Sequence, residues 1–263
     1  MNPFYFGSSE RPLFGVYHPP TGSEVRDEGV VLCYPFGQEY MRSHRAFRQL
    51  AFLLSKRGFH VFRFDYHGTG DSAGASTDVS VSECVENVHQ AVEELAEQAG
   101  VSRMSLVGLR LGATFAAQAA KKAGRLDGLV LWDPVVDGND YYEQMRCSAN
   151  PSNSRAKGAR SQPGDLIGVL GFPITRSLRD GIRGLDLRSL GGVPVDEILI
   201  ISSSEQSGFE ELLTQFGQDT AVTYQCVPSP GSWNEVDNFG GVLIPQAIIQ
   251  SIVAWFVQRQ VTV

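Results

Sequence analysis

The sequence of 263 residues lacks several features that would indicate particular protein classes. Its best apolar stretch, residues 242–257, is interrupted by Pro245 and Gln246, so no stretch predicts a membrane span. Its net charge of −7 argues against nucleic acid as the main partner, because phosphate binding favours a basic surface. The first residues also lack the cationic and apolar segments of a secretory signal. We therefore expect a cytoplasmic protein without a membrane span.

Cysteine and histidine are scarce, and their placement excludes further kinds of site. The four cysteines are scattered and form no Cys-x-x-Cys pair, which argues against both a disulfide framework and a zinc site. We expect reduced thiols, no metal and no cofactor. The five histidines stand at positions 18, 44, 60, 67 and 89, all in the first third of the chain.

Short apolar segments alternate with amphipathic ones along most of the chain. This alternation predicts an α/β fold, with a mostly parallel central sheet and helices on both of its faces. Ser43 is expected to cap one helix, which Gly58 would end. The expected elements are a hairpin over residues 3–18, strands over 30–34, 61–64, 104–107, 129–132, 198–201 and 222–227, and helices over 43–58, 81–99, 113–122 and 244–256.

Residues 139–190 interrupt this alternation and predict a lid or cap inserted into the core. The core would then comprise residues 1–138 and 191–263. The insertion holds eight Lys/Arg against five Asp/Glu, the opposite balance from the rest of the chain. A basic lid over an acidic body indicates either an anionic ligand or a lid that adheres to its own domain.

One glycine motif has the layout of a nucleophile elbow. Residues 108–112, Gly-Leu-Arg-Leu-Gly, stand between a predicted strand and a predicted helix. In such an elbow the middle residue is exposed on a strained turn, while the glycines let strand and helix pack closely. The middle residue here is Arg110. A second glycine-rich turn, residues 65–72, has the pattern Asp-x-x-Gly-x-Gly-x-Ser.

With these motifs the sequence resembles α/β-hydrolases of the serine aminopeptidase (S33) group. More narrowly, it is similar to exosortase A system-associated hydrolases in its GLRLGA elbow (108–113), its FDxxGTGDSAG turn (64–74) and its WDPV stretch (132–135). The resemblance covers about residues 28–137. It implies an α/β-hydrolase fold with a lid, and a setting in a bacterial exopolysaccharide locus.

The Ser-His-Asp chemistry of that fold is absent from the motif positions. Arg110 stands at the nucleophile position, and a guanidinium cannot be deprotonated there. The catalytic base of the fold follows the last strand, where residues 228–234 contain no histidine and Trp233 stands roughly in its place. Glu205 could occupy the position of the acid. His67 beside Ser72 is an imidazole–hydroxyl pair, although that turn is usually structural.

Arg110 has two interpretations, which do not exclude each other. It could form an ion pair with Asp133 and hold the pocket shut, or it could bind an anionic or acyl ligand at the helix N-terminus. Backbone N–H groups of Phe36 and Gly37 could serve as donors to such a ligand. The other residues expected around this pocket are Glu39, Tyr141 and Trp233.

Three functions follow from these interpretations. The first is a non-catalytic ligand-binding or accessory protein on a hydrolase scaffold. The second is an unconventional acyl or ester hydrolase or transferase, in which Arg110 works with His67, Glu39 or Asp133. The third is a structural partner of a related hydrolase or of a second copy of the chain, which would expose an apolar surface.

Overall fold

An eight-stranded sheet in the order β1-β2-β4-β3-β5-β6-β9-β10 organises the chain. The structure, a computed structural model, describes residues 1–148, 167–169, 171–205, 208–218, 220–229, 233 and 244–259. β2 is antiparallel to both of its neighbours, and the remaining neighbours are parallel. The strands are β1 (Asn2–Phe6), β2 (Leu13–His18), β3 (Glu28–Cys33), β4 (His60–Phe64), β5 (Arg103–Leu109), β6 (Leu126–Trp132), β9 (Val195–Ser202) and β10 (Ala221–Cys226).

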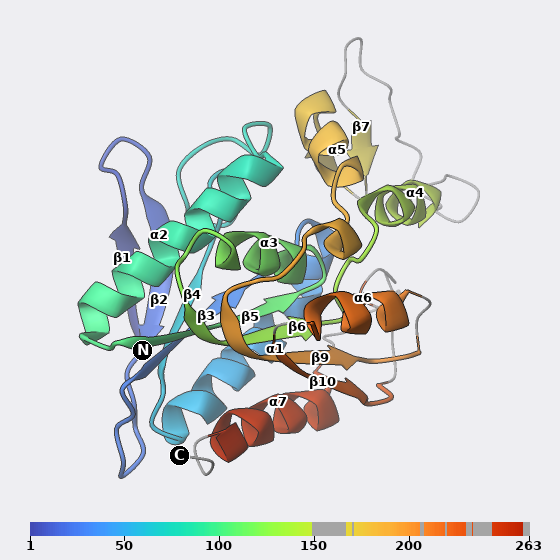
Figure 1. The fold of residues 1–263 in the computed structure, drawn as a ribbon. Helices are drawn as coiled ribbons and strands as arrows, with labels where there is room; N and C mark the ends of the chain where they lie inside the picture. Colours follow the sequence, from blue (N-terminus) through green and yellow to red (C-terminus); the bar gives the residue numbers. More distant parts are fainter. Residues whose placement is uncertain are drawn as a thin grey trace.

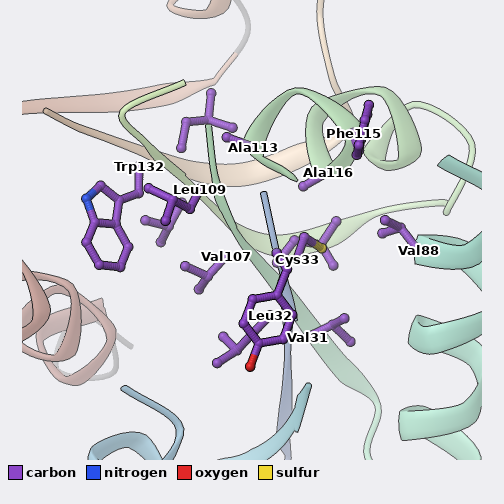
Figure 2. Close-up of a cluster of buried hydrophobic side chains, with 14 of the residues drawn as sticks. Val31, Leu32, Cys33, Val88, Val107, Leu109, Ala113, Phe115, Ala116 and Trp132 are labelled. Atoms are coloured by element: carbon purple, nitrogen blue, oxygen red, sulfur yellow. The ribbon is translucent and has the colours of Figure 1, made fainter. Parts of the chain in front are cut away.

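Helices cover both faces of the sheet, as the sequence predicts. In the view of Figure 1, α2 (Val81–Ala99) and α3 (Leu111–Ala120) lie above the sheet, and α1 (Gln38–Lys56) and α7 (Gln246–Gln258) lie below it. Every residue of β3 is buried, because this strand has a neighbour on each side and helices on both faces. Figure 2 shows part of the resulting core, with Leu32, Val107 and Trp132 among its side chains.

Two helices show how well local signals predicted boundaries. α2 spans the expected residues, because Ser80 accepts the N–H of Glu83 at its start and Gly100 is left-handed at its end. The expected start of α1 at Ser43 is wrong. α1 begins at Gln38 after Gly37, whose φ of 64° suits glycine, and the Ser43 hydroxyl donates to a carbonyl inside the helix.

The segment between β6 and β9 contains its own small elements. They are α4 (Gly138–Ser148), the hairpin β7 (Ile167–Val169) and β8 (Phe172–Ile174), α5 (Arg176–Arg183) and the 3-10 helix η1 (Leu187–Ser189). α4, α5 and β7 lie together at the top right of Figure 1. Three of the basic residues expected in the lid, Arg155, Lys157 and Arg160, lie outside the described residues.

One further helix, α6 (Phe209–Phe216), lies between β9 and β10 and was not expected from the sequence. Across the described ranges, none of the helices combines the length and the apolar character that a membrane crossing needs.

Candidate functional site

Four parallel strands end side by side and bring their following loops together. Cys33 of β3 pairs with Gly108 of β5, Leu109 with Trp132 of β6, and Trp132 with Ile201 of β9. The carboxyl ends of parallel strands form the usual ligand-binding edge of an open α/β sheet. The loops after these strands carry Gly37, Arg110, Asp133 and Ser203, so the candidate site lies there.

The elbow at Arg110 has the strained geometry that its glycines predict. Arg110 has φ 54° and ψ −122°, and its N–H donates to the Trp132 carbonyl at 3.0 Å. A Cβ at Gly112 would collide with the backbone carbonyls of Cys33 and Tyr34. The chain therefore keeps the close strand–helix approach of a nucleophile elbow and holds a guanidinium at its tip.

Glu39, and not Asp133, is the ionic partner of Arg110. Arg110 Nε donates to Glu39 Oε1 at 3.0 Å, and the two side chains are 12% and 2% exposed. Tyr141 of α4 donates its hydroxyl to Glu39 Oε2 at 3.0 Å, and the guanidinium lies 5.3 Å from the centre of its ring. The interpretation of Arg110 as the ion-pair partner of Asp133 is therefore wrong: the hydrogen bond from Arg110 to Asp133 goes to its main-chain carbonyl, from Nη1 at 3.2 Å.

Burial and neighbouring charges together shift the pKa values of Arg110 and Tyr141. Burial alone would lower the pKa of Arg110. The charge and hydrogen bond of Glu39, together with Tyr141 and Asp133, outweigh that effect, and the pKa is raised. Burial, and then the charge of Glu39, also raises the pKa of Tyr141 well above its ordinary value. At neutral pH, Arg110 is thus a cation and Tyr141 a neutral hydrogen-bond donor.

Asp133 is held by three donors that carry no charge. Its Oδ1 accepts the N–H of Ser203 at 2.7 Å and the Ser203 hydroxyl at 3.0 Å. Its Oδ2 accepts the indole N–H of Trp233 at 2.9 Å. Trp233 thus donates to a carboxylate as a catalytic histidine would, but an indole has no second nitrogen to accept a proton. Trp233 also packs edge-to-face on Trp132, with ring centres 5.4 Å apart.

A cavity of about 770 Å³ opens above this arrangement. Arg110, Asp133, Tyr141 and Trp233 line it, as expected. The other expected ligand-binding residues do not: Phe36, Gly37 and Glu39 border a separate void of about 20 Å³ under the β7–β8 hairpin. The expected set is therefore divided between the two spaces, with Tyr141 bordering both.

His67 and Ser72 do not form the imidazole–hydroxyl pair that the sequence left open. The Ser72 hydroxyl donates to the carbonyl of Asp65 at 2.6 Å and accepts the N–H of Phe14 at 2.8 Å. Neither His67 nor Ser72 lines the described cavity. The turn is thus structural, with Asp65 accepting the Tyr40 hydroxyl at 2.9 Å.

Sequence reasoning missed a second charged group at the cavity wall. Arg188, in η1, contacts Asp137 at 2.7 Å and Asp186 at 2.8 Å, and lies 3.8 Å from Glu211 of α6. No sequence motif marks this cluster. Among the described residues, no group of three or more His, Cys, Asp or Glu is placed to hold a metal ion.

Comparison with known proteins agrees with this geometry. The family model described as serine aminopeptidase, S33, matches residues 30–161. The chain belongs to this family. It is also 33% identical over 119 residues to the protein ABHD12B of Homo sapiens, an alignment that covers 43% of this chain. The chain spans about a third of the length of that relative, since the alignment covers 32% of it.

Solved structures show the same fold. Est1E from Butyrivibrio proteoclasticus superimposes with a TM-score of 0.71 at 11% identity, over all of both chains. Alpha/beta hydrolase domain-containing protein 10 from mouse gives 0.60 at 14% identity, over 98% of each chain. The chain therefore has the α/β-hydrolase fold that its motifs predict.

Proposed function

We propose that this chain is a non-catalytic, ligand-binding or accessory member of the serine aminopeptidase S33 family. The observation that supports this most is the buried pair of Arg110 and Glu39 at the tip of the elbow. A nucleophile must offer an electron pair there, and a protonated guanidinium has none.

The second support is the group that faces Asp133. A serine hydrolase needs a base that takes a proton from the nucleophile while an acid orients it. Here the donor to Asp133 is Trp233, and no histidine is among the described residues that line the cavity. Asp133 therefore faces a hydrogen-bond donor that cannot act as a base.

In this proposal Arg110 accepts an anionic or acyl ligand through hydrogen bonds and not through a net positive charge. Glu39 cancels its charge, while Nη2 makes no hydrogen bond within the described part of the chain. An oxygen of an acyl or carboxylate group could therefore accept an N–H of Nη2, which has two, but would not meet an uncompensated cation. Residues 139–190 would act as the lid, since α4 places Tyr141 at the cavity wall. The motifs at 64–74, 108–113 and 132–135 support the proposed setting in a cytoplasmic bacterial exopolysaccharide system.

A screen for acyl turnover tests the proposal. Wild type, Arg110→Ala and Arg110→Ser are incubated with p-nitrophenyl and thioester acyl substrates and with a fluorophosphonate probe. We expect no turnover and no labelling, even with serine at position 110, because Trp233 cannot act as its base. Thermal unfolding of each variant checks the fold. The double variant Glu39→Gln with Arg110→Met removes both charges of the pair together, so that neither charge is left buried without its partner.

The second candidate function is unconventional catalysis with Arg110 as an oxyanion donor and Asp133 moving protons, since His67 and Glu39 do not line the large cavity. Positive φ angles at both Arg110 and Asp133 favour it, because backbone strain of this kind gathers at functional sites. Wild-type turnover that is lost in a folded Arg110→Ala variant would establish this second function and overturn the first.

A further inference from the structure

The outward face of α1 carries large apolar side chains and basic ones in a single row. Helical positions three or four residues apart lie on the same face, and five exposed residues of α1 follow that spacing. We call them the α1 stripe: Met41, Arg45, Arg48, Phe52 and Lys56. Met41 is 63% exposed and Phe52 is 51% exposed, so both apolar side chains are available to a partner.

The positive charges of the α1 stripe are not neutralised by carboxylates within the described part of the chain. α1 contains a single acidic residue, Glu39, which is buried and pairs with Arg110 instead. The basic members of the stripe form no salt bridge with the described residues. Lys56 Nζ lies 4.5 Å from the centre of the Phe52 ring, so a basic and an apolar member of the stripe are in contact.

The helices on the two faces of the sheet differ in charge. α7 lies beside α1 below the sheet in Figure 1, where Gln49 donates to Gln246 at 2.9 Å, and the sequence of α7 contains no charged residue. α2, above the sheet, contains no Lys or Arg but five glutamates: Glu83, Glu86, Glu93, Glu94 and Glu97. In a chain of net charge −7, the side formed by α1 and α7 is therefore the one that would turn toward a negatively charged partner.

From this pattern we infer that the α1 stripe binds the surface of an anionic lipid bilayer. Its basic residues would lie at the negative headgroups, while Met41 and Phe52 would enter the boundary between headgroups and acyl chains. The stripe is about 22 Å long at the helical rise per residue, so the helix would lie flat along the membrane surface. Such a contact is peripheral and reversible, and it needs no helix that crosses the membrane.

The apolar members of the stripe favour a lipid surface over a nucleic acid. Duplex phosphates would attract the basic residues equally well, but they offer no apolar surface to Met41 or Phe52. The inference goes beyond the proposed function, because none of the five residues of the stripe lines the large cavity.

Co-sedimentation of the full chain with unilamellar vesicles tests the inference. Vesicles of phosphatidylcholine with about 30% phosphatidylglycerol supply the negative surface, and vesicles of phosphatidylcholine alone are the neutral comparison. We expect at least about tenfold tighter binding to the anionic vesicles, because each exposed Lys or Arg near such a surface contributes about fivefold. Raising the salt from about 0.1 M to about 1 M should release most of the protein, because the charges are exposed and screened.

Matched variants locate the contact. Arg48→Gln should weaken binding to the anionic vesicles about fivefold. Lys122→Gln removes the same charge from an exposed position just after α3, the helix beside α2, and should leave the binding unchanged. Phe52→Ser should also weaken binding about fivefold, because it removes apolar area that would be buried in the lipid.

Fluorescence quenching tests whether the stripe enters the bilayer. Lipids brominated in their acyl chains should quench the emission of a Phe52→Trp variant, whereas the native tryptophans are buried and should keep theirs. Four results would overturn the inference: equal binding to neutral and anionic vesicles, equal losses at Arg48 and Lys122, no effect of Phe52→Ser, or tighter binding to a DNA duplex than to the anionic vesicles.

Discussion

Glu39→Gln is expected to lower the free energy of unfolding by about 3 kcal/mol, because it leaves Arg110 buried without its carboxylate. Two charges about 4 Å apart attract each other by about 4 kcal/mol at the effective dielectric constant of about 20 that suits protein sites. Glutamine keeps one acceptor for Arg110 or Tyr141, which would retain about 1 kcal/mol. The small exposure of the pair, 2% for Glu39 and 12% for Arg110, means that solvent recovers little of the loss.

Urea unfolding at pH 7, followed by circular dichroism, measures this change. The cycle is completed by Arg110→Met and by the double variant, and we expect a coupling energy of about 2–3 kcal/mol between the two positions. Glu143→Gln is the control, because Glu143 pairs with Arg146 on the surface and should change stability by less than about 0.5 kcal/mol. A coupling energy near zero would refute the view that this pair holds the elbow.

Three further predictions concern pH, the indole donor and the elbow glycine. Burial, and then a neighbouring arginine, lowers the pKa of His18 to about 4 from 6.5, so the unfolded chain takes up a proton first as the pH falls. Stability should drop by about 2–3 kcal/mol between pH 6.5 and 4, and His18→Asn should flatten that dependence in urea titrations at stepped pH. Trp233→Phe leaves the buried Asp133 without one donor and should lower the free energy of unfolding by about 1–3 kcal/mol. An unchanged urea midpoint would show that this bond contributes nothing to folding. Gly112→Ala places a Cβ against backbone carbonyls and should cost at least about 2 kcal/mol, whereas Gly168→Ala meets open space and should stay within about 0.5 kcal/mol.

Helices and strands could be predicted from the sequence where apolar residues recur at regular spacing and capping residues mark both ends. α2 carries both, with Ser80 at its start and Gly100 at its end, and its limits agree with the expectation. α1 was given too late a start, because a serine is a common cap and the role of Gly37 depends on its φ of 64°. α6 was missed because its eight residues provide barely two turns of periodicity.

The candidate site was likewise predicted where a local sequence signal marks the residue, and missed where the contact depends on the fold. Arg110 could be found because the flanking glycines and the strand–helix order are local signals. Its partner could not, because Glu39 is 71 positions away in the chain and its approach depends on where α1 begins. Asp133 was correctly expected near the elbow, but its carboxylate faces Ser203 and Trp233, a direction that no spacing in the sequence encodes.

The contacts also explain why one substitution would not restore a serine hydrolase. Arg110→Ser would supply a hydroxyl but leave Glu39, 2% exposed, without its cation. The new hydroxyl would still lack a base, since Trp233 donates to Asp133 and has no lone pair available to accept a proton. Replacing Trp233 by histidine would in turn open space beside Trp132, against which the indole packs. Catalysis by a serine triad would therefore require coordinated changes at positions 39, 110 and 233, which is a stronger barrier than the absence of one nucleophile.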